Sequence, residues 1–167
     1  MIGYTQAVQT IIRNVAQPPP EERLALTAAG QRVLSRALSA PHDMPPFAQS
    51  LMDGYALRSR DSRAATPEQP ARLTLGATLT AGEYLEQPLK PRQAVRIMTG
   101  APIPPGADAV LKMEDSAVEG GDLIIRQPLD RWVNVQRRGD EIRRHTVVLP
   151  RGAVSYTHLT LPTIYSV

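Results

Sequence analysis

An aspartate in an Asp-Gly pair is the first residue of this sequence that could do chemistry. It is Asp53, within the segment 43–58 (DMPPFAQSLMDGYALR), and Ser50 lies three residues before it. Glycine allows a close approach of backbone or ligand, so Gly54 would leave room for a bound molecule beside the carboxylate. An Asp-Gly pair between apolar residues is also typical of a hairpin or tight turn, in which the aspartate caps its own backbone. The segment therefore predicts either a presented acid or an ordinary turn.

A threonine hydroxyl at the end of an apolar run is the second candidate. Thr99 and Gly100 follow the run 94–98, and a proline-rich loop, 102–105, leads to a second apolar run. The prolines would hold the hydroxyl in place at low entropic cost, which suits contact with a ligand. The same pattern also fits a strand–turn–strand unit that binds nothing.

Two adjacent carboxylates form the third candidate. The segment 134–142 (NVQRRGDEI) carries Arg137, Asp140 and Glu141 around a glycine. Carboxylates suit hard cations such as Mg²⁺, which binds through one or two protein carboxylates together with substrate phosphates. The alternative is a solvated loop whose charges partly compensate one another and contribute little to stability.

Several other chemistries are missing from the sequence. There is no cysteine, which excludes disulfides, thiolate metal sites and cysteine nucleophiles. Glycine-rich nucleotide loops, the G-x-S-x-G elbow and the H-E-x-x-H zinc motif are absent too. His42, His145 and His158 are far apart and lack ligand spacing, so we expect them to be surface or packing residues.

The composition is that of an ordinary folded protein, with 42% hydrophobic and 21% charged residues. No apolar run is long enough to span a bilayer and no secretory signal is visible, so we expect a cytoplasmic protein without a membrane partner. The net charge of +3 is a small excess. Its arginine clusters are not interleaved with aromatic residues, so we do not expect nucleic-acid binding.

The elements that must position these residues are short strands preceded by one helix. Apolar residues at helical spacing predict an amphipathic helix over 4–16, with Thr5 as its N-cap and prolines 18–20 as its end. Residues 70–150 read mostly as short strands, with a hairpin turn at 119–122. The 16 prolines and 11 glycines agree with many short segments. The expected fold class is α+β and strand-rich.

Taken together, these segments resemble one family. The motifs occur in order and at similar spacing: D-G-Y-A at 53–56, R-I-M-T-G-A at 96–101, P-G-A-D-A-V at 105–110, and the stretch 134–141. The chain resembles the N-terminal region of MoeA-type molybdopterin molybdenumtransferases, the family that includes the gephyrin E-domain. The resemblance runs from about residue 4 to about residue 153, and the combined set of motifs is specific.

The resemblance implies a domain organisation. An N-terminal helix, 1–17, precedes two intertwined, mostly β subdomains: a connector formed by 20–45 and 140–153, and a compact β subdomain, 46–139. In the family this helix packs on a separate substrate domain, so we expect its apolar face to be exposed or packed against an improvised partner here. The uncharged tail, 154–167, does not resemble the family; it is either native or lies outside the original reading frame.

The resemblance also implies a reaction. Family members insert molybdenum from molybdate into the dithiolene of adenylylated molybdopterin, with Mg²⁺ assisting and AMP released, in molybdenum cofactor biosynthesis. They are homodimers whose cleft lies between the N-terminal region of one protomer and the substrate domain of the other, and molybdopterin adenylyltransferase is an implied partner. Because this sequence lacks a substrate domain, we expect no insertion activity from the chain alone.

Site residues carry over position by position. The implied catalytic residues are Asp53, Thr99 and Glu141, the implied substrate-binding residues are Ser50, Asp140 and Arg137, and no metal ligand is assigned. The family's usual Gly-Glu-Asp order reads Gly-Asp-Glu at 139–141. The functional acid is therefore either Glu141, with one more methylene of reach, or Asp140.

Two other functions stay open. The chain could be a non-catalytic scaffold module that binds a partner protein through its β surface. It could also be a β domain that binds anions or nucleic acid nonspecifically, in which case binding must weaken steeply with salt.

Overall fold

The computed structural model describes residues 2–15 and 20–156, and the chain divides into two compact units. One unit combines both ends of the chain, Met1–Leu38 and Val147–Val167, and the other is Ser39–Thr146. The fold is α+β and strand-rich, as the sequence predicts. The expected subdomain boundaries near residues 45 and 140 stay predictions.

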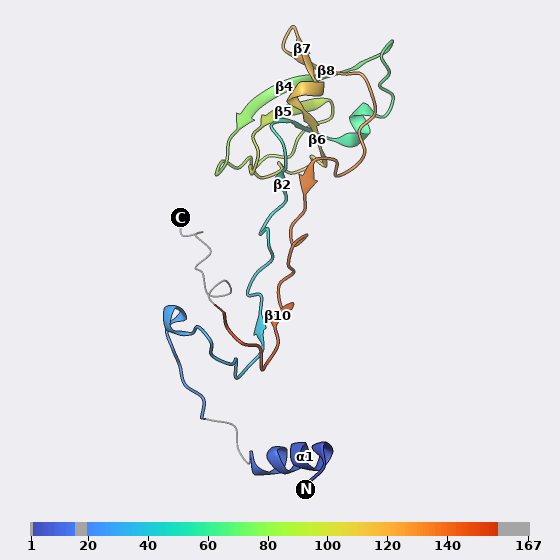
Figure 1. The fold of residues 1–167 in the computed structure, drawn as a ribbon. Helices are drawn as coiled ribbons and strands as arrows, with labels where there is room; N and C mark the ends of the chain where they lie inside the picture. Colours follow the sequence, from blue (N-terminus) through green and yellow to red (C-terminus); the bar gives the residue numbers. More distant parts are fainter. Residues whose placement is uncertain (1, 16–19, 157–167) are drawn as a thin grey trace. The chain divides into compact units, whose positions relative to one another are not determined.

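The described residues contain one helix, three 3-10 turns and ten strands, joined by loops (Figure 1). In chain order they are α1 (Tyr4–Asn14), η1 (Leu26–Ala28), β1 (Leu38–Ser39), β2 (Gln49–Ser50), β3 (Gly54–Leu57), η2 (Ser59–Ser62), β4 (Ala71–Leu79), β5 (Gln93–Ile97), β6 (Ala109–Lys112), η3 (Met113–Asp115), β7 (Ala117–Glu119), β8 (Asp122–Ile125), β9 (Val135–Gln136) and β10 (Val147–Leu149). Within the described part of the chain, no helix has the length and apolar character that crossing a bilayer requires.

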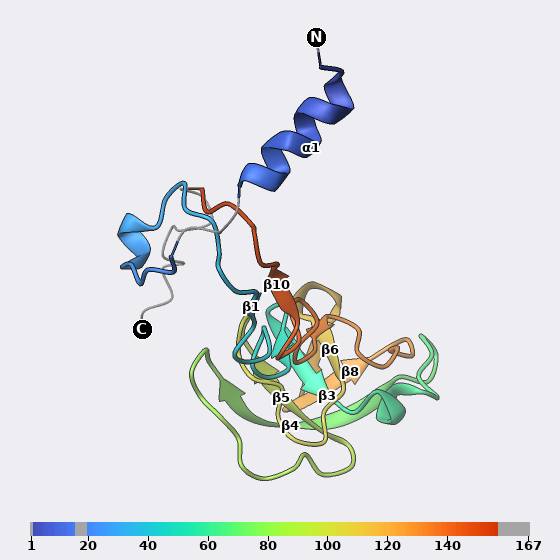
Figure 2. The same cartoon turned by 90° about the horizontal axis from the view of Figure 1, so that it is seen from below.

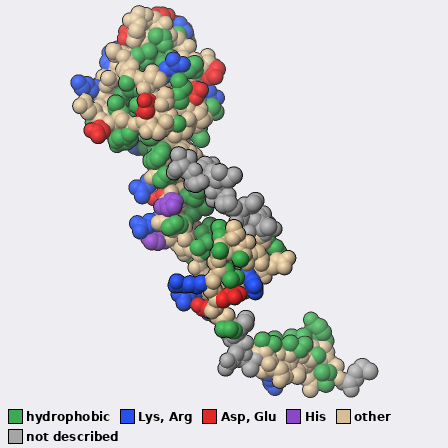
Figure 3. Space-filling model, turned by 90° about the vertical axis from the view of Figure 1, so that its left-hand side faces the viewer, with side chains coloured by type: hydrophobic (Ala, Val, Ile, Leu, Met, Phe, Trp, Pro, Cys, Tyr) green, Lys and Arg blue, Asp and Glu red, His purple; other side chains and the backbone are tan. Residues whose placement is uncertain are grey.

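The helix α1 forms where its apolar spacing predicts it. Its N-cap is Gly3 and no side chain caps it, so the prediction of Thr5 as N-cap is wrong. It buries none of its residues, and Figure 3 shows hydrophobic side chains gathered along one side of it. Tyr4 and Ile12 are 85% and 66% exposed. Residues 16–19, where the prolines begin, lie outside the described residues.

Residues 31–39 pair with residues 147–155. Val33 bridges Val154, and the Leu34 N–H donates to the Ala153 carbonyl at 2.9 Å. Strands β1 and β10 form a two-stranded sheet. The tail therefore begins as a paired segment, and its residues 157–167 lie outside the described part.

A curled six-stranded sheet dominates the Ser39–Thr146 unit, in the order β6-β3-β5-β4-β8-β7 (Figure 2). Strands β4 and β5 are parallel, and the other neighbours are antiparallel. The hairpin predicted at 119–122 is confirmed: β7 and β8 pair across Gly120 and Gly121, which both have positive φ.

Both faces of this sheet are buried. Tyr55 and Leu57 on β3 belong to one apolar cluster, and Ala56 between them belongs to another. Successive residues of a strand point to opposite faces, so the two clusters lie on the two sides of the sheet. All four residues of β3 are buried as a result.

The prediction of a hairpin turn at Asp53–Gly54 is also wrong. No hairpin turn is centred on Asp53–Gly54; β3 begins at Gly54, between Ile97 of β5 and Lys112 of β6. A Cβ at Gly54 would lie 2.0 Å from the Leu111 carbonyl oxygen. The glycine therefore serves a close approach of two strands, and Asp53 lies just before the strand.

An antiparallel ribbon, defined as residues 40–50 and 134–146, joins this sheet (Figure 1). Met44 bridges Ile142, and β2 pairs with β9 with Gln49 opposite Gln136. The prolines at 41, 45 and 46 lack N–H donors, so pairing along the ribbon is intermittent.

We predict that Gly54→Ala destabilises the chain by more than about 2 kcal/mol, because the added methyl must push apart two hydrogen-bonded backbones. Urea unfolding measures the change. Gly76→Ala on β4 is the matched control: its Cβ would lie 3.3 Å from the flexible end of Gln93, so a smaller loss is expected. Equal stability of the two variants would contradict the packing argument.

Candidate functional site

Asp53 and Thr99 are in direct contact. The register that pairs Gly54 with Ile97 places the residue before β3 near the residues that follow β5. The Thr99 N–H donates to Oδ1 of Asp53 at 2.7 Å, and the Thr99 hydroxyl donates to the same oxygen at 2.8 Å. The fold thus brings into contact two residues that lie in separate motifs of the sequence.

These two hydrogen bonds keep Asp53 ionised. The Thr99 backbone N–H, followed by its hydroxyl, lowers the pKa of Asp53 below the usual aspartate value, and the charge of Arg96 adds to the effect. Both donors are neutral, so they orient the carboxylate without pairing its charge. Among the described residues no hydrogen bond reaches Oδ2 of Asp53.

Ser50 shapes the turn that leads to Asp53. Its side chain is buried, and its hydroxyl donates to the Met52 carbonyl at 2.6 Å. Its backbone is tied to the Thr99 loop, since the Gly100 N–H donates to the Ser50 carbonyl at 2.8 Å. Its substrate-binding role stays a prediction; the observed contacts serve the geometry of the loop.

One glutamine of the ribbon donates a hydrogen bond to Glu141, and a second glutamine donates to the first. The Gln136 side-chain amide donates to Oε1 of Glu141 at 2.7 Å, and the Gln49 amide donates to Oε1 of Gln136 at 2.7 Å. Gln49 lies next to Ser50 on β2. Glu141 is therefore linked to the strand whose backbone holds the Thr99 loop.

Asp140 is engaged differently from its neighbour. Its Oδ2 accepts the Arg137 N–H at 2.8 Å, and its Oδ1 lies 3.4 Å from the Arg137 guanidinium. The backbone N–H of Arg137, assisted by its charge, lowers the pKa of Asp140. Arg137 and Asp140 thus form a local turn with each other, and within the described residues no hydrogen bond or ion pair joins their side chains to Asp53 or Thr99.

The sequence reasoning missed several residues that build the site. Asp43 accepts the Arg144 N–H at 2.7 Å and the Arg138 guanidinium at 2.6 Å, and these contacts lower the pKa of Asp43. Asn134, with φ of 55°, donates its side-chain amide to the Val110 carbonyl and accepts the Leu51 N–H. Asparagine tolerates this left-handed conformation, which was the only signal available for it.

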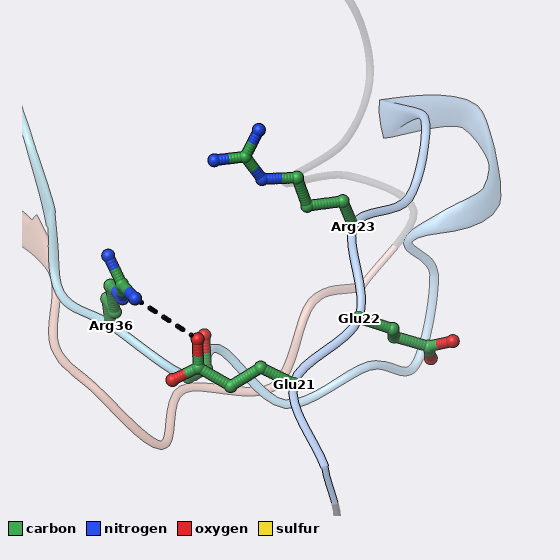
Figure 4. Close-up of a pocket in the computed structure, with 5 residues that line it drawn as sticks. Glu21, Glu22, Arg23 and Arg36 are labelled. Carbon is green, nitrogen blue, oxygen red and sulfur yellow. Dashed lines mark hydrogen bonds and ion pairs between the residues drawn. The ribbon is translucent and has the colours of Figure 1, made fainter.

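A separate cavity of about 390 Å³ lies in the other unit, lined by Glu21, Glu22, Arg23, Ser35 and Arg36 (Figure 4). Its glutamates already pair with arginines: Glu21 lies 3.3 Å from Arg36, and Glu22 lies 3.4 Å from Arg32. These pairs are exposed and contribute little energy. The cavity contains none of the residues that the sequence implicates.

The acidic residues discussed above bear on whether the chain could hold a metal ion. Within residues 2–15 and 20–156, no group of three or more acidic or histidine side chains could enclose a metal ion. Mg²⁺ commonly binds through one or two carboxylates plus substrate phosphates. Asp53 and Glu141 each have one carboxylate oxygen that accepts no hydrogen bond among the described residues, so either could contribute one ligand to a cation that a bound phosphate also holds.

Comparisons with known proteins cover almost the whole chain. A family model described as "MoeA N-terminal region (domain I and II)" matches residues 2–159. The chain is 36% identical over 154 residues to a molybdopterin molybdenumtransferase of Synechococcus elongatus, covering 91% of this chain and 38% of that protein. It is 39% identical over 151 residues to molybdopterin molybdenumtransferase 2 of Mycobacterium tuberculosis, covering 89% and 37%.

The structure agrees with these sequence matches. A crystal structure of the molybdopterin biosynthesis moeA protein from Pyrococcus horikoshii superimposes with a TM-score of 0.87 at 27% identity, covering 96% of this chain and 42% of that one. The chain thus spans less than half the length of the relatives it matches.

We predict that the Asp53 carboxyl titrates below the ordinary aspartate pKa of about 3.9 and that Thr99→Val raises this pKa. The valine removes the hydroxyl donor but keeps the backbone N–H, so the pKa stays below the ordinary value. Carbon-detected NMR titration measures it, and Thr99→Ser is the control that retains the hydroxyl. An unchanged pKa in Thr99→Val would show that the hydroxyl bond does not form.

The same contact makes stability depend on pH. Because the pKa of Asp53 is lower in the folded than in the unfolded chain, its carboxylate stabilises the fold above the unfolded pKa, and this stabilisation is lost as pH falls through the folded pKa. The stability difference between wild type and Asp53→Asn is therefore expected to be full at neutral pH and to shrink in acid. A difference that stays constant would contradict this.

Proposed function

The chain belongs to the MoeA family as its N-terminal region, domains I and II, and we propose that it forms the N-terminal part of a molybdopterin molybdenumtransferase, a transferase of molybdenum cofactor biosynthesis. The match over residues 2–159 confirms the resemblance seen in the motifs. The contact between Asp53 and Thr99 is the observation that carries the assignment of the site.

The proposed reaction transfers molybdenum from molybdate to the dithiolene of molybdopterin. Relatives are named for molybdopterin. The finer features belong to the proposal: an adenylylated substrate, release of AMP, and Mg²⁺ as cofactor. Adenylylated molybdopterin carries phosphate groups and molybdate is itself an anion, so the cleft must accommodate dense negative charge beside its own carboxylates.

Asp53 and Glu141 are the proposed metal-binding residues. Each carboxylate is held by neutral donors on one oxygen, which leaves its other oxygen for a cation. A Mg²⁺ ion bound there with substrate phosphates would offset the repulsion between anionic substrate and carboxylates. Thr99 fixes the orientation of Asp53, and Glu141 is the better candidate acid because Asp140 is paired with Arg137.

Arg137 and Ser50 have supporting roles in this proposal. Arg137 provides positive charge beside the proposed cleft, and its pairing with Asp140 fixes the turn that carries Glu141. Ser50 sets the path of the chain between β2 and Asp53.

The remaining features of the proposal concern assembly. We expect a cytoplasmic homodimer in which a substrate domain completes the cleft, with molybdopterin adenylyltransferase as a partner that delivers substrate. The exposed apolar side of α1 suits packing on a further domain. Because the proposed cleft is complete only with a substrate domain, these 167 residues on their own are expected to be inactive.

We predict that residues 2–153 can replace the matching N-terminal region of the Synechococcus elongatus relative, and that Asp53→Asn in this chimera lowers molybdate-dependent AMP release about 100-fold. The loss is expected because an amide cannot provide the charge of the carboxylate. Asp115→Asn, an exposed aspartate of η3, is the matched control and should leave the rate unchanged.

The outcomes of the chimera experiment separate the alternatives. A folded chimera without activity, beside an active relative, would contradict the proposed function. An active chimera in which Asp53→Asn behaves like Asp115→Asn would keep the function and reject the site. Dimerisation or partner capture by the chain without affinity for molybdopterin would favour an interaction module.

A further inference from the structure

Two glutamines form a directed pair of hydrogen bonds that ends on Glu141. Gln49 donates to Gln136 at 2.7 Å, and Gln136 donates to Glu141 at 2.7 Å. The glutamines are opposite each other in the β2–β9 register, so their side chains leave the ribbon on the same face. Their approach is thus built into the backbone pairing.

The order of donors and acceptors gives this pair of bonds a direction. A side-chain amide has one acceptor end and one donor end. The Gln49 amide occupies the oxygen of Gln136, so the NH₂ group of Gln136 points toward Glu141. Only an acceptor, such as a carboxylate, suits the position that Glu141 fills.

The strand that carries Gln49 is fixed by the Thr99 loop. Gln49 bridges Pro102 on its side away from Gln136, and the Ser50 N–H donates to the Ala101 carbonyl at 3.0 Å. A displacement of this loop would therefore move Gln49 and, through Gln136, the carboxylate. The two proposed acids are linked by a chain of short contacts in one unit.

A neutral hydrogen-bond donor affects the charge of a carboxylate differently from an arginine. The Arg137 guanidinium offsets the charge of Asp140, whereas the Gln136 amide orients Glu141 and leaves its net negative charge intact. No other hydrogen bond of the described residues reaches the Glu141 carboxylate. This distinguishes two neighbouring acids that the sequence leaves equivalent.

We infer that Gln49 and Gln136 are positioning residues that hold the Glu141 carboxylate in a fixed orientation for a cationic or metal-bound ligand, an assignment that rests on the proposed function of the site. Neither glutamine needs to touch the ligand. Their effect is exerted through Glu141, as outer-shell hydrogen bonds act on the carboxylates of metal sites.

NMR of the full 167-residue chain tests the hydrogen bonds without any activity. We expect the Gln136 side-chain NH₂ signal to be shifted downfield by the carboxylate and to lose this shift in Glu141→Ala. Gln49→Met keeps about the length of the side chain but removes the donor without adding an acceptor, so the Gln136 amide is no longer oriented from that side and the shift should also be reduced, which a purely packing role would not do. Gln127→Leu, at an exposed glutamine, is the control and should leave the signal in place.

The chimera then tests the role. Gln136→Leu is expected to lower kcat about tenfold with little change in KM, while Gln127→Leu changes neither. A Gln136 NH₂ signal that is insensitive to both Glu141→Ala and Gln49→Met would overturn the inference, as would an unchanged kcat in Gln136→Leu. Neither result bears on Asp53→Asn, so failure of this inference and failure of the proposed function are distinguishable.

Discussion

The backbone of residues 48–51 is the constraint on which the candidate site depends. On one side it exchanges hydrogen bonds with the loop that follows β5, through Ala48 and Ser50. On the other side it pairs with β9, and the Leu51 N–H donates to the Asn134 carbonyl. Residues 48–51 therefore fix the loop after β5 and the strand β9 relative to each other. Residues that are distant in sequence keep a defined geometry for this reason.

The acids considered for the site differ from other acids of this unit in the kind of donor that holds them. Asp43, Asp108 and Asp140 each lie within ion-pair distance of an arginine, and each also accepts a backbone N–H. These carboxylates hold turns and loops together. Asp53 and Glu141 instead accept hydrogen bonds from the neutral groups of Thr99 and Gln136.

This difference has chemical meaning because a neutral donor restricts a carboxylate without offsetting its charge. A carboxylate paired with arginine has little remaining attraction for a cation, whereas one held by an amide or a hydroxyl retains it. The surrounding sheet supplies the rigidity that such a site needs, since both of its faces are packed. Asp53 and Thr99 lie beside the ends of β3 and β5 in this sheet, and residues supported by strands are positioned more precisely than residues on free loops.

Much of the local structure followed from the sequence alone. Apolar spacing determined the helix Tyr4–Asn14, and a glycine pair between apolar runs determined the hairpin of β7 and β8. The motifs were sufficient to predict the family and, through that resemblance, to place Asp53 and Thr99 at one site. The helix and the hairpin depend on short-range geometry, which a single stretch of residues specifies.

The roles that depend on pairing between distant segments became visible in the folded structure. Gly54 looked like a turn glycine, but its neighbour is the backbone of β6, more than fifty residues later in the chain. Gln49 and Gln136 carried no signal, because a glutamine acquires direction only from the partners at its two ends. The choice between Asp140 and Glu141 likewise required knowing which donor reaches each oxygen, and hydrogen-bond partners across a fold are set by strand register, not by residue type.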